Sequence, residues 1–287
     1  MSSETAIKID ELSKVYPNGT KAVDNFSLEV SSDDLLIIIG CSGAGKSTLL
    51  RCMNRLIEPT SGSISLMGKD ITHVHGKDLR ETRERVGMIF QQFNLVSRMT
   101  VLDNVLAGRL PHCKNLFWRG ASNFRVFPKS EKEFAFECLR KVGIEALAYQ
   151  RADNLSGGQQ QRVAIARALA QEPVVMLADE PVASLDPASS EAVMEALHDI
   201  QERDKIPVVV NLHQIDLAKH YAKRVVGMLE GRKVFEGSAA ELTNDMLEQI
   251  YDVEVDLSTG RPKTKKLKKP VVNKSLPEDN APQLATT

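Results

Sequence analysis

The sequence lacks the features that would place a chain within or beyond a membrane. No apolar run approaches the roughly 20 residues that a membrane-spanning helix needs; the longest are Leu35–Ile39, Val174–Ala178 and Val208–Val210. The start shows no basic region followed by an apolar stretch, so no signal peptide is expected. The four cysteines form no Cys-x-x-Cys pair and no metal-site spacing, which predicts reduced thiols. Together these absences predict a soluble, cytoplasmic chain.

The chain also lacks an excess of either charge, but its charges are unevenly distributed. The 287 residues include 37 Lys and Arg against 38 Asp and Glu. Residues 257–287 carry a net charge of +5, which leaves −6 for residues 1–256. A body this acidic argues against binding to nucleic-acid phosphates, so no nucleic-acid partner is expected. The segment 257–287 is rich in Pro and Lys and poor in apolar residues, and we expect a disordered basic tail.

Short apolar runs alternate with helical patterns, which is typical of a parallel sheet covered by helices. Leu35–Ile39 is expected to form a buried central strand, followed by a helix over Lys46–Leu56. Val174–Ala178 and Val208–Leu212, each introduced by a proline, predict two further strands. Between residues 91 and 154 the apolar spacings are three and four, which indicates a mostly helical insertion. The expected fold is α/β over residues 1–256, with a helical subdomain at about 91–157.

A glycine-rich segment follows the first of these strands directly. Residues 40–47 match the phosphate-loop pattern G-x-x-x-x-G-K-[ST], in which backbone N–H groups turn inward around an anion at a helix N-terminus. We expect Lys46, as a surface charge facing the ligand, to reach the β- and γ-phosphates, and Ser47 to ligate Mg²⁺. The alternative is a glycine-rich turn with a surface lysine. Cys41 is either a small, tolerated loop residue or a redox-sensitive thiol. The predicted nucleotide-binding residues here are Gly40, Cys41, Ser42, Gly43, Ala44, Gly45, Lys46, Ser47 and Thr48.

Two adjacent carboxylates close the second apolar run. Successive strand residues point to opposite sides, so Asp179 and Glu180 are expected to serve different partners. Asp179 is placed to hold Mg²⁺ beside Ser47, and Glu180 to orient or deprotonate a water at the γ-phosphate. The alternative is a solvated strand end.

A second anion site is predicted at a helix start far from the phosphate loop. Ser156 is a good N-cap, two glycines follow it, and the alanine-rich stretch beyond is a strong helix. One nucleotide needs one phosphate loop, so a second site of this kind suggests nucleotide shared between two copies. A capped helix without ligand is the alternative. The predicted binding residues are Ser156, Gly157, Gly158 and Gln159.

The order of phosphate loop, Leu155–Gln159 and acidic strand resembles the nucleotide-binding cassette of ABC transporters, over residues 5 to about 250. The resemblance implies a P-loop (RecA-like) core with a parallel-rich sheet, an antiparallel β part at the N-terminus and the inserted helical subdomain. It also implies ATP and Mg²⁺ as cofactors.

Four smaller motifs fit the same resemblance. Tyr16 is similar to the aromatic residue that stacks on adenine, and Gln91 to the glutamine that senses Mg²⁺ and the attacking water. Ser184-Leu185-Asp186 resembles the loop that touches the partner subunit, and His213 resembles the histidine that contacts the γ-phosphate. Surface packing of Tyr16, a helix start at Asp186 and a structural His213 are the alternatives.

Among ABC cassettes, the sequence resembles the ATP-binding subunit of phosphonate importers. The stretches that carry this are Val86–Val96, Asn104–Gly108, Phe117–Arg119, Gln150–Asp153 and Ala183–Pro187. Cys41 and the Lys-rich tail depart from the family pattern. The resemblance implies an ATPase that binds a second copy of itself and membrane permease subunits at the cytoplasmic face of the membrane. A periplasmic or lipid-anchored substrate-binding protein would act indirectly.

The sequence does not decide which solute is imported or which surface of the chain contacts the permease. Phosphonate, phosphite and phosphate importers could share such an ATPase, and an importer of another small solute is a further alternative. A soluble ABC ATPase and a P-loop kinase are the competing classes. The apolar set that forms a candidate dock for the permease, with ordinary burial as the alternative, is Phe93, Leu95, Val96 and Met99.

Overall fold

The computed structural model describes residues 4–112, 127–251, 254–255 and 262–263. The strands are β1 (Thr5–Val15), β2 (Lys21–Ser31), β3 (Leu35–Ile39), β4 (Ser61–Leu66), β5 (Lys69–Asp70), β6 (Val86–Ile89), β7 (Val175–Asp179), β8 (Val208–Asn211), β9 (Arg224–Leu229), β10 (Arg232–Gly237), β11 (Glu254–Val255) and β12 (Pro262–Lys263). The α-helices are α1 (Lys46–Met53), α2 (Gly76–Glu84), α3 (Val101–Leu106), α5 (Lys129–Lys141), α6 (Gly157–Leu169), α7 (Pro187–Asp204), α8 (Ile215–Tyr221) and α9 (Asn244–Tyr251). The short 3-10 helices are η1 (Ala107–His112), η2 (Glu145–Leu147), η3 (Ala152–Asn154) and η4 (Ala239–Glu241).

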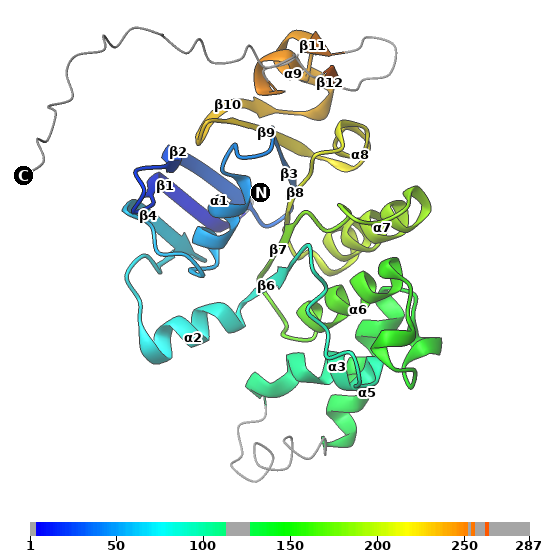
Figure 1. The fold of residues 1–287 in the computed structure, drawn as a ribbon. Helices are drawn as coiled ribbons and strands as arrows, with labels where there is room; N and C mark the ends of the chain where they lie inside the picture. Colours follow the sequence, from blue (N-terminus) through cyan, green and yellow to red (C-terminus); the bar gives the residue numbers. More distant parts are fainter. Residues whose placement is uncertain (1–3, 113–126, 252–253, 256–261, 264–287) are drawn as a thin grey trace, which may run out of the picture.

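Two main sheets organise the chain. A six-stranded sheet has the order β10-β9-β3-β8-β7-β6, and all its pairs are parallel except β9 with β10. An antiparallel sheet of order β2-β1-β4-β5 lies beside it, and α1 packs between the two (Figure 1). The predicted fold class is therefore confirmed, including the antiparallel β part near the N-terminus.

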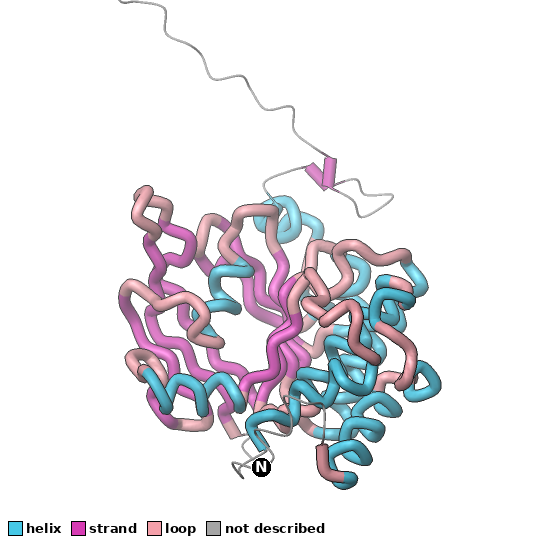
Figure 2. The backbone as a smooth tube through the Cα atoms, turned by 60° about the horizontal axis from the view of Figure 1, so that its bottom comes forward, coloured by secondary structure: helices cyan, strands magenta, loops and turns pink. Residues whose placement is uncertain are grey.

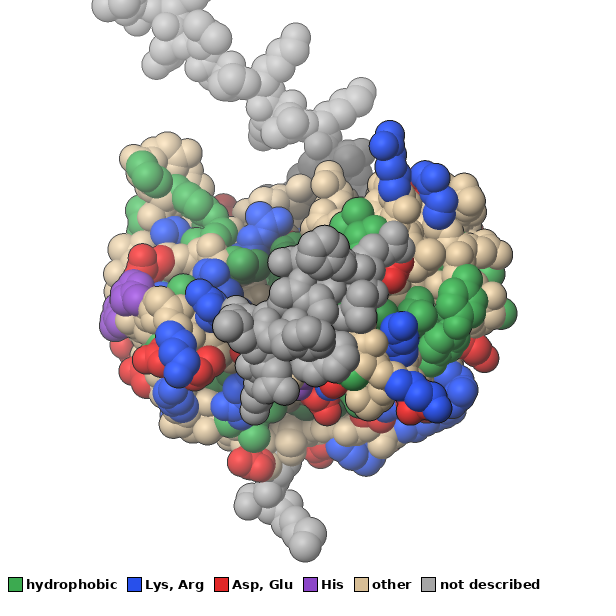
Figure 3. Space-filling model, turned by 90° about the horizontal axis from the view of Figure 1, so that it is seen from below, with side chains coloured by type: hydrophobic (Ala, Val, Ile, Leu, Met, Phe, Trp, Pro, Cys, Tyr) green, Lys and Arg blue, Asp and Glu red, His purple; other side chains and the backbone are tan. Residues whose placement is uncertain are grey.

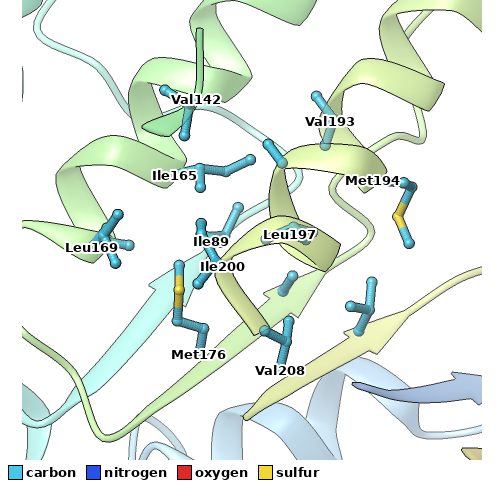
Figure 4. Packing of buried hydrophobic residues seen from close by; sticks show 14 of the residues in the cluster. Ile89, Val142, Ile165, Leu169, Met176, Val193, Met194, Leu197, Ile200 and Val208 are labelled. Atoms are coloured by element: carbon cyan, nitrogen blue, oxygen red, sulfur yellow. The ribbon is translucent and has the colours of Figure 1, made fainter. Parts of the chain in front are cut away.

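The central strand β3 is buried on both faces. Leu35, Ile37 and Ile39 face the cluster of buried residues that includes α6 and α7, while Leu36 and Ile38 face α1 and the antiparallel sheet. Because side chains alternate along a strand, a strand covered on both faces must be apolar throughout. Figure 4 shows the first cluster, in which Ile165 of α6 and Leu197 of α7 lie on the same side of the sheet.

The helices α3, α5 and α6 gather at one side of the sheet, as Figures 1 and 2 show. The described part of residues 91–157 contains helices and no strand, as the sequence predicts. Residues 113–126, with the Phe117–Arg119 stretch, lie outside the described residues. No helix in the described ranges is long and apolar enough to cross a membrane. On the face seen in Figure 3, visible basic and acidic side chains are intermixed.

Three element boundaries differ from the sequence expectation. Helix α1 ends at Met53 instead of Leu56, because the chain turns through Arg55, whose φ is +52°. Strand β7 begins and ends one residue later than predicted, so that Asp179 is its last residue. Strand β8 ends at Asn211, one residue earlier than predicted.

Most of the predicted tail lies outside the described residues, and the boundary at residue 257 stays a prediction. Two of its residues, Pro262 and Lys263, form β12, which pairs antiparallel with β11 across that boundary.

Candidate functional site

The carboxyl ends of three neighbouring parallel strands meet beside one cavity. Gly40 follows β3, Asp179 ends β7 and Asn211 ends β8; Asn211 is paired in register with both Ile38 and Asp179. The cavity has a volume of about 210 Å³. Crevices at this edge of an open parallel sheet are where ligands bind in such folds. Its lining residues are Ala22, Ser42, Gly43, Ala44, Gly45, Lys46, Ser47, Thr48, Glu180 and His213.

The loop over residues 40–45 is shaped by close backbone contacts that only glycine permits. Gly45 has a φ of +103°, and a β-carbon there would lie 1.9 Å from the carbonyl oxygen of Ala22. The amide of Gly231, in the turn between β9 and β10, donates to the carbonyl of Ala44 at 2.9 Å. The loop is therefore held from outside in one conformation, and α1 begins directly after it, at Lys46.

Lys46 is more deeply buried than the sequence analysis predicts. The residue is only 4% exposed, and its Nζ donates to the carbonyl oxygens of Gly40 at 2.8 Å and Cys41 at 3.0 Å. The expectation of a surface charge is wrong, because the loop wraps around the amino group. Burial lowers the pKa of Lys46, opposed by the negative charge of Glu180. The side chain still lines the cavity, where it can meet an anion.

Ser47 and Asp179 lie side by side, as the sequence predicts for a metal site. The Ser47 hydroxyl donates to Oδ1 of Asp179 at 2.7 Å, and Asp179 is 3% exposed. A hydroxyl and a carboxylate are hard oxygen donors of the kind that Mg²⁺ prefers. The donor set therefore fits this ion.

Glu180 and His213 face each other at the mouth of the cavity. Oε1 of Glu180 lies 2.6 Å from Nε2 of His213. Glu180 has a φ of +52°, a left-handed conformation that is uncommon for a residue other than glycine and that clusters at functional sites. A carboxylate held in this way can accept a proton from a water or orient one.

Tyr16 lies at the margin of the cavity. Its hydroxyl is 3.2 Å from Oγ1 of Thr48, a lining residue, and Nζ of Lys14 is 5.5 Å from the centre of its ring. The half-buried ring is thus placed near the phosphate loop, at the end of β1.

Gln91, the Ser156–Gln159 group and Asp186 do not line this cavity. Ser156 caps α6 by a reciprocal pair of hydrogen bonds with Gln159, and Asp186 caps α7 by accepting from the amide of Ser189 at 3.0 Å. The two helix starts touch, since a β-carbon on Gly158 would lie 2.6 Å from Cβ of Ser189. They form a second surface of their own, which includes exposed Ser156 and Asp186.

Comparison with known proteins gives the family. Residues 23–183 match the ABC transporter family. Over 245 residues the chain is 51% identical to the Phosphonates import ATP-binding protein PhnC of Bacillus anthracis, covering 85% of this chain and 94% of that relative. It is 48% identical to the Phosphonates import ATP-binding protein PhnC 3 of Halalkalibacterium halodurans, covering 85% of this chain and 93% of the relative. This chain belongs to the ABC transporter family.

Solved structures agree with this membership. A dimeric ATP-binding cassette in a post-hydrolysis state, bound to ADP and Pi, is similar with a TM-score of 0.71 at 32% identity, covering 81% of this chain and 98% of that one. The cassette cbiO1 from Clostridium perfringens is similar with a TM-score of 0.73 at 30% identity, covering 86% of this chain and 94% of that one. The family predicted from the order of the motifs is confirmed, and with it the assignment of an ATPase.

In this ABC cassette, Gln91 is tied to α6 through its neighbours. Gln91 is exposed two residues beyond β6. Arg167 of α6 donates to the carbonyl oxygens of Phe93 at 3.0 Å and Asn94 at 2.6 Å. Gln161, one turn beyond the start of the same helix, donates to the carbonyl of Phe90 at 3.4 Å. The segment around Gln91 is therefore fastened to the helix that begins after Ser156.

Three residues that the sequence did not indicate contact the site of this cassette. Asn211 and Arg51 both donate to the carboxylate of Asp179, at 3.1 Å and 3.3 Å. The hydroxyl of Tyr251, at the end of α9, donates to the carbonyl of His213 at 3.4 Å, and burial raises the pKa of Tyr251 to about 12. A polar residue closing an apolar strand beside the acidic one was the available signal for Asn211.

The cysteines of the cassette differ in how deeply they are buried. All three within the described residues are free, and Cys113 lies outside those residues. Burial raises the pKa of Cys52 to about 11 and that of Cys138 to about 12, so both stay protonated thiols at neutral pH. Cys41 is half-buried in the phosphate loop.

Proposed function

We propose that this chain is the ATP-hydrolysing subunit of an importer that moves phosphonates or a related phosphorus oxyanion through a membrane permease. ATP hydrolysis is supported by one observation: a cavity is lined by Lys46, Ser47, Glu180 and His213 together, and Ser47 is hydrogen-bonded to Asp179. The substrate class is supported by the relatives named as phosphonate import proteins, which are identical to this chain at about half of the aligned positions.

In this proposal the triphosphate of ATP lies over the loop of residues 40–45, where inward N–H groups and the start of α1 attract negative charge. Lys46 leaves the carbonyls of its own loop, at least in part, and donates to the β- and γ-phosphate oxygens. Thr48 adds a phosphate contact, and the ring of Tyr16 stacks on adenine. The buried charge of Lys46 acts strongly because little solvent screens it.

Ser47 and Asp179 would hold Mg²⁺, which neutralises charge on the phosphates. Glu180 orients the attacking water and accepts its proton, while His213 fixes the carboxylate and contacts the γ-phosphate. Gln91 reaches the same centre when the segment held by Arg167 moves with α6.

Two copies of the chain complete the site between them. The start of α6, at which Ser156 is exposed, Gly157 and Gln159 are half-buried and Gly158 is buried, faces the γ-phosphate of nucleotide bound to the partner copy. A helix N-terminus attracts negative charge, and the Ser156 hydroxyl that caps α6 lies at this one. Asp186, at the neighbouring helix start, contacts the partner subunit. Each ATP is then enclosed only when both copies close.

The permease contact is proposed beside Gln91. Val96 is 55% exposed, whereas Leu95 packs on the core. Phe93 and Met99 are half-buried, and Tyr149 is 75% exposed with its ring tilted at 59° to that of Phe136. The exposed Val96 and Tyr149 are the apolar side chains that would meet a membrane subunit, which supports a location at the cytoplasmic face of the membrane. A substrate-binding protein outside the membrane acts on the permease and not on this chain.

A growth experiment tests the substrate class. A strain that lacks the gene is supplied with methylphosphonate, phosphite or phosphate as the only phosphorus source and complemented with the wild-type chain or with Glu180→Gln. Wild type, and not the variant, should restore growth on methylphosphonate. Growth restored only on phosphite or phosphate would move the proposal to that oxyanion. Unimpaired growth of the deleted strain on all three would favour an importer of another solute or a soluble ATPase.

A further inference from the structure

Asn211 is a buried amide at the end of an otherwise apolar strand. It follows Val208, Val209 and Val210, and like them it is fully buried. Its Nδ2 donates to Oδ1 of Asp179 at 3.1 Å, and its Oδ1 has no hydrogen-bond partner among the described residues. A buried amide with one oxygen unsatisfied destabilises the fold relative to an apolar side chain of the same shape. A contact that serves the site would explain why such a group stands there.

The carboxylate of Asp179 accepts hydrogen bonds from three side chains, one of which is Asn211. Oδ1 accepts from both the Ser47 hydroxyl and Asn211, and Oδ2 accepts from Arg51 at 3.3 Å. Arg51 is half exposed and pairs through a long contact, so solvent competes for it. Asn211 lies where solvent does not compete, in register with Asp179 on the neighbouring strand. It is therefore the rigid member of the set.

We propose that Asn211 is a positioning residue for the divalent metal ion. It holds the Asp179 carboxylate in the rotamer in which its oxygen faces Ser47, so that the pair is set before the metal ion arrives. This inference rests on the proposed binding of ATP and Mg²⁺. Outer-shell partners of this kind typically change metal affinity by about 10- to 100-fold when removed.

The test uses Mn²⁺ as the probe and the full-length chain saturated with a non-hydrolysable ATP analogue. Free Mn²⁺ is followed by its electron paramagnetic resonance signal during titration, which gives metal affinity without turnover. Asn211→Val, whose side chain suits a buried strand, should weaken Mn²⁺ binding by roughly 10-fold or more. Affinity for the analogue in EDTA should stay within about twofold of wild type, because Asn211 does not line the cavity.

Gln201 offers a matched control. It is a fully buried amide of α7 whose Nε2 donates to the carbonyl of Asp33 at 3.0 Å and whose Oε1 lacks a partner among the described residues, as in Asn211. Gln201→Leu should leave Mn²⁺ affinity unchanged. If Asn211→Val does not fold, Asn211→Ser replaces it, since the serine hydroxyl ends too short to reach Asp179.

The outcomes separate the two proposals. Wild-type Mn²⁺ affinity in a folded Asn211 variant overturns the positioning role. An equal loss in Gln201→Leu also overturns it, because a general effect of buried amides would then explain the loss. If the wild-type chain with analogue binds Mn²⁺ no better than the analogue alone, the metal site of the proposed function fails instead.

Discussion

His213 Nε2 lies 2.6 Å from Glu180 Oε1, and the contact joins the ends of two neighbouring parallel strands over one cavity. Glu180 holds a left-handed backbone conformation at this point, and the carbonyl of His213 is held in turn by Tyr251. Both partners are thus fixed by the chain around them. A carboxylate positioned in this way has a fixed direction in which to accept a proton.

Glu180→Gln should keep ATP binding and stop turnover. The amide retains the size of the side chain and a hydrogen bond to His213 but cannot accept the proton. Loss of a general base typically lowers the rate by about 10²- to 10⁴-fold. Because ATP is then bound but not consumed, size-exclusion chromatography with Mg-ATP should show a species of twice the mass. Hydrolysis at the wild-type rate would show that Glu180 is not the base.

Lys46→Ala should remove ATP binding while the chain stays folded. A hydrogen bond to a charged group contributes about 1.5–3 kcal/mol, so the Kd for ATP should rise at least roughly 10- to 150-fold. Nucleotide titration measures this, and circular dichroism checks the fold. Lys129→Ala, at an exposed position on α5, is the control and should bind ATP as wild type does. Undiminished affinity in folded Lys46→Ala would exclude this cavity as the site.

The sequence was sufficient to place Ser47 beside Asp179, because the carboxyl ends of the parallel strands β3 and β7 lie at one edge of the sheet, with β8 between them. It could not show the burial of Lys46, which depends on how the loop closes on Ala22 and Gly231. Sequence periodicity identifies apolar faces, but it does not show which carbonyl a buried polar side chain meets.

Sequence periodicity could not predict the contacts that α6 makes with other segments, for the same reason. Nothing in the sequence distinguishes Arg167 from other basic residues of helices. Its hydrogen bond to the carbonyl of Phe93 is visible only in the folded chain. The contact of Gly158 with Ser189 joins two helix starts that are far apart in the sequence. Such contacts have no periodicity to detect.

Gly158→Ala should separate the starts of α6 and α7. The added β-carbon would lie 2.6 Å from Cβ and Oγ of Ser189, so the helices must move apart, at a cost of about 1–3 kcal/mol of unfolding free energy. Ser189→Gly removes both atoms and should recover part of this loss in the double variant. Gly157→Ala is the control, because its nearest obstacle is the flexible end of Leu185. Purely additive effects of Gly158→Ala and Ser189→Gly in urea denaturation would contradict the contact.

Ser156→Arg should leave ATP binding to one copy nearly intact and abolish hydrolysis. Ser156 is exposed at the start of α6 and does not line the cavity of its own chain. A bulky cation there blocks the approach of the partner copy's γ-phosphate. The change also removes an N-cap, which is worth about 0.5–2 kcal/mol of helix stability. Ser156→Ala therefore serves as the control for that loss, and it should retain much more activity than the arginine variant.

Mixing then tests whether the site is shared between copies. In a mixed dimer of Ser156→Arg with Lys46→Ala, one composite site carries both changes, and the other combines an intact phosphate loop with an intact helix start. Partial ATPase activity should return on mixing if one intact site can turn over alone. Strict cooperation between the two sites would suppress that return. The decisive measurement is therefore the turnover of Ser156→Arg alone. Wild-type turnover by Ser156→Arg would mean that the start of α6 does not complete the active site, and the two-copy arrangement would have to be abandoned.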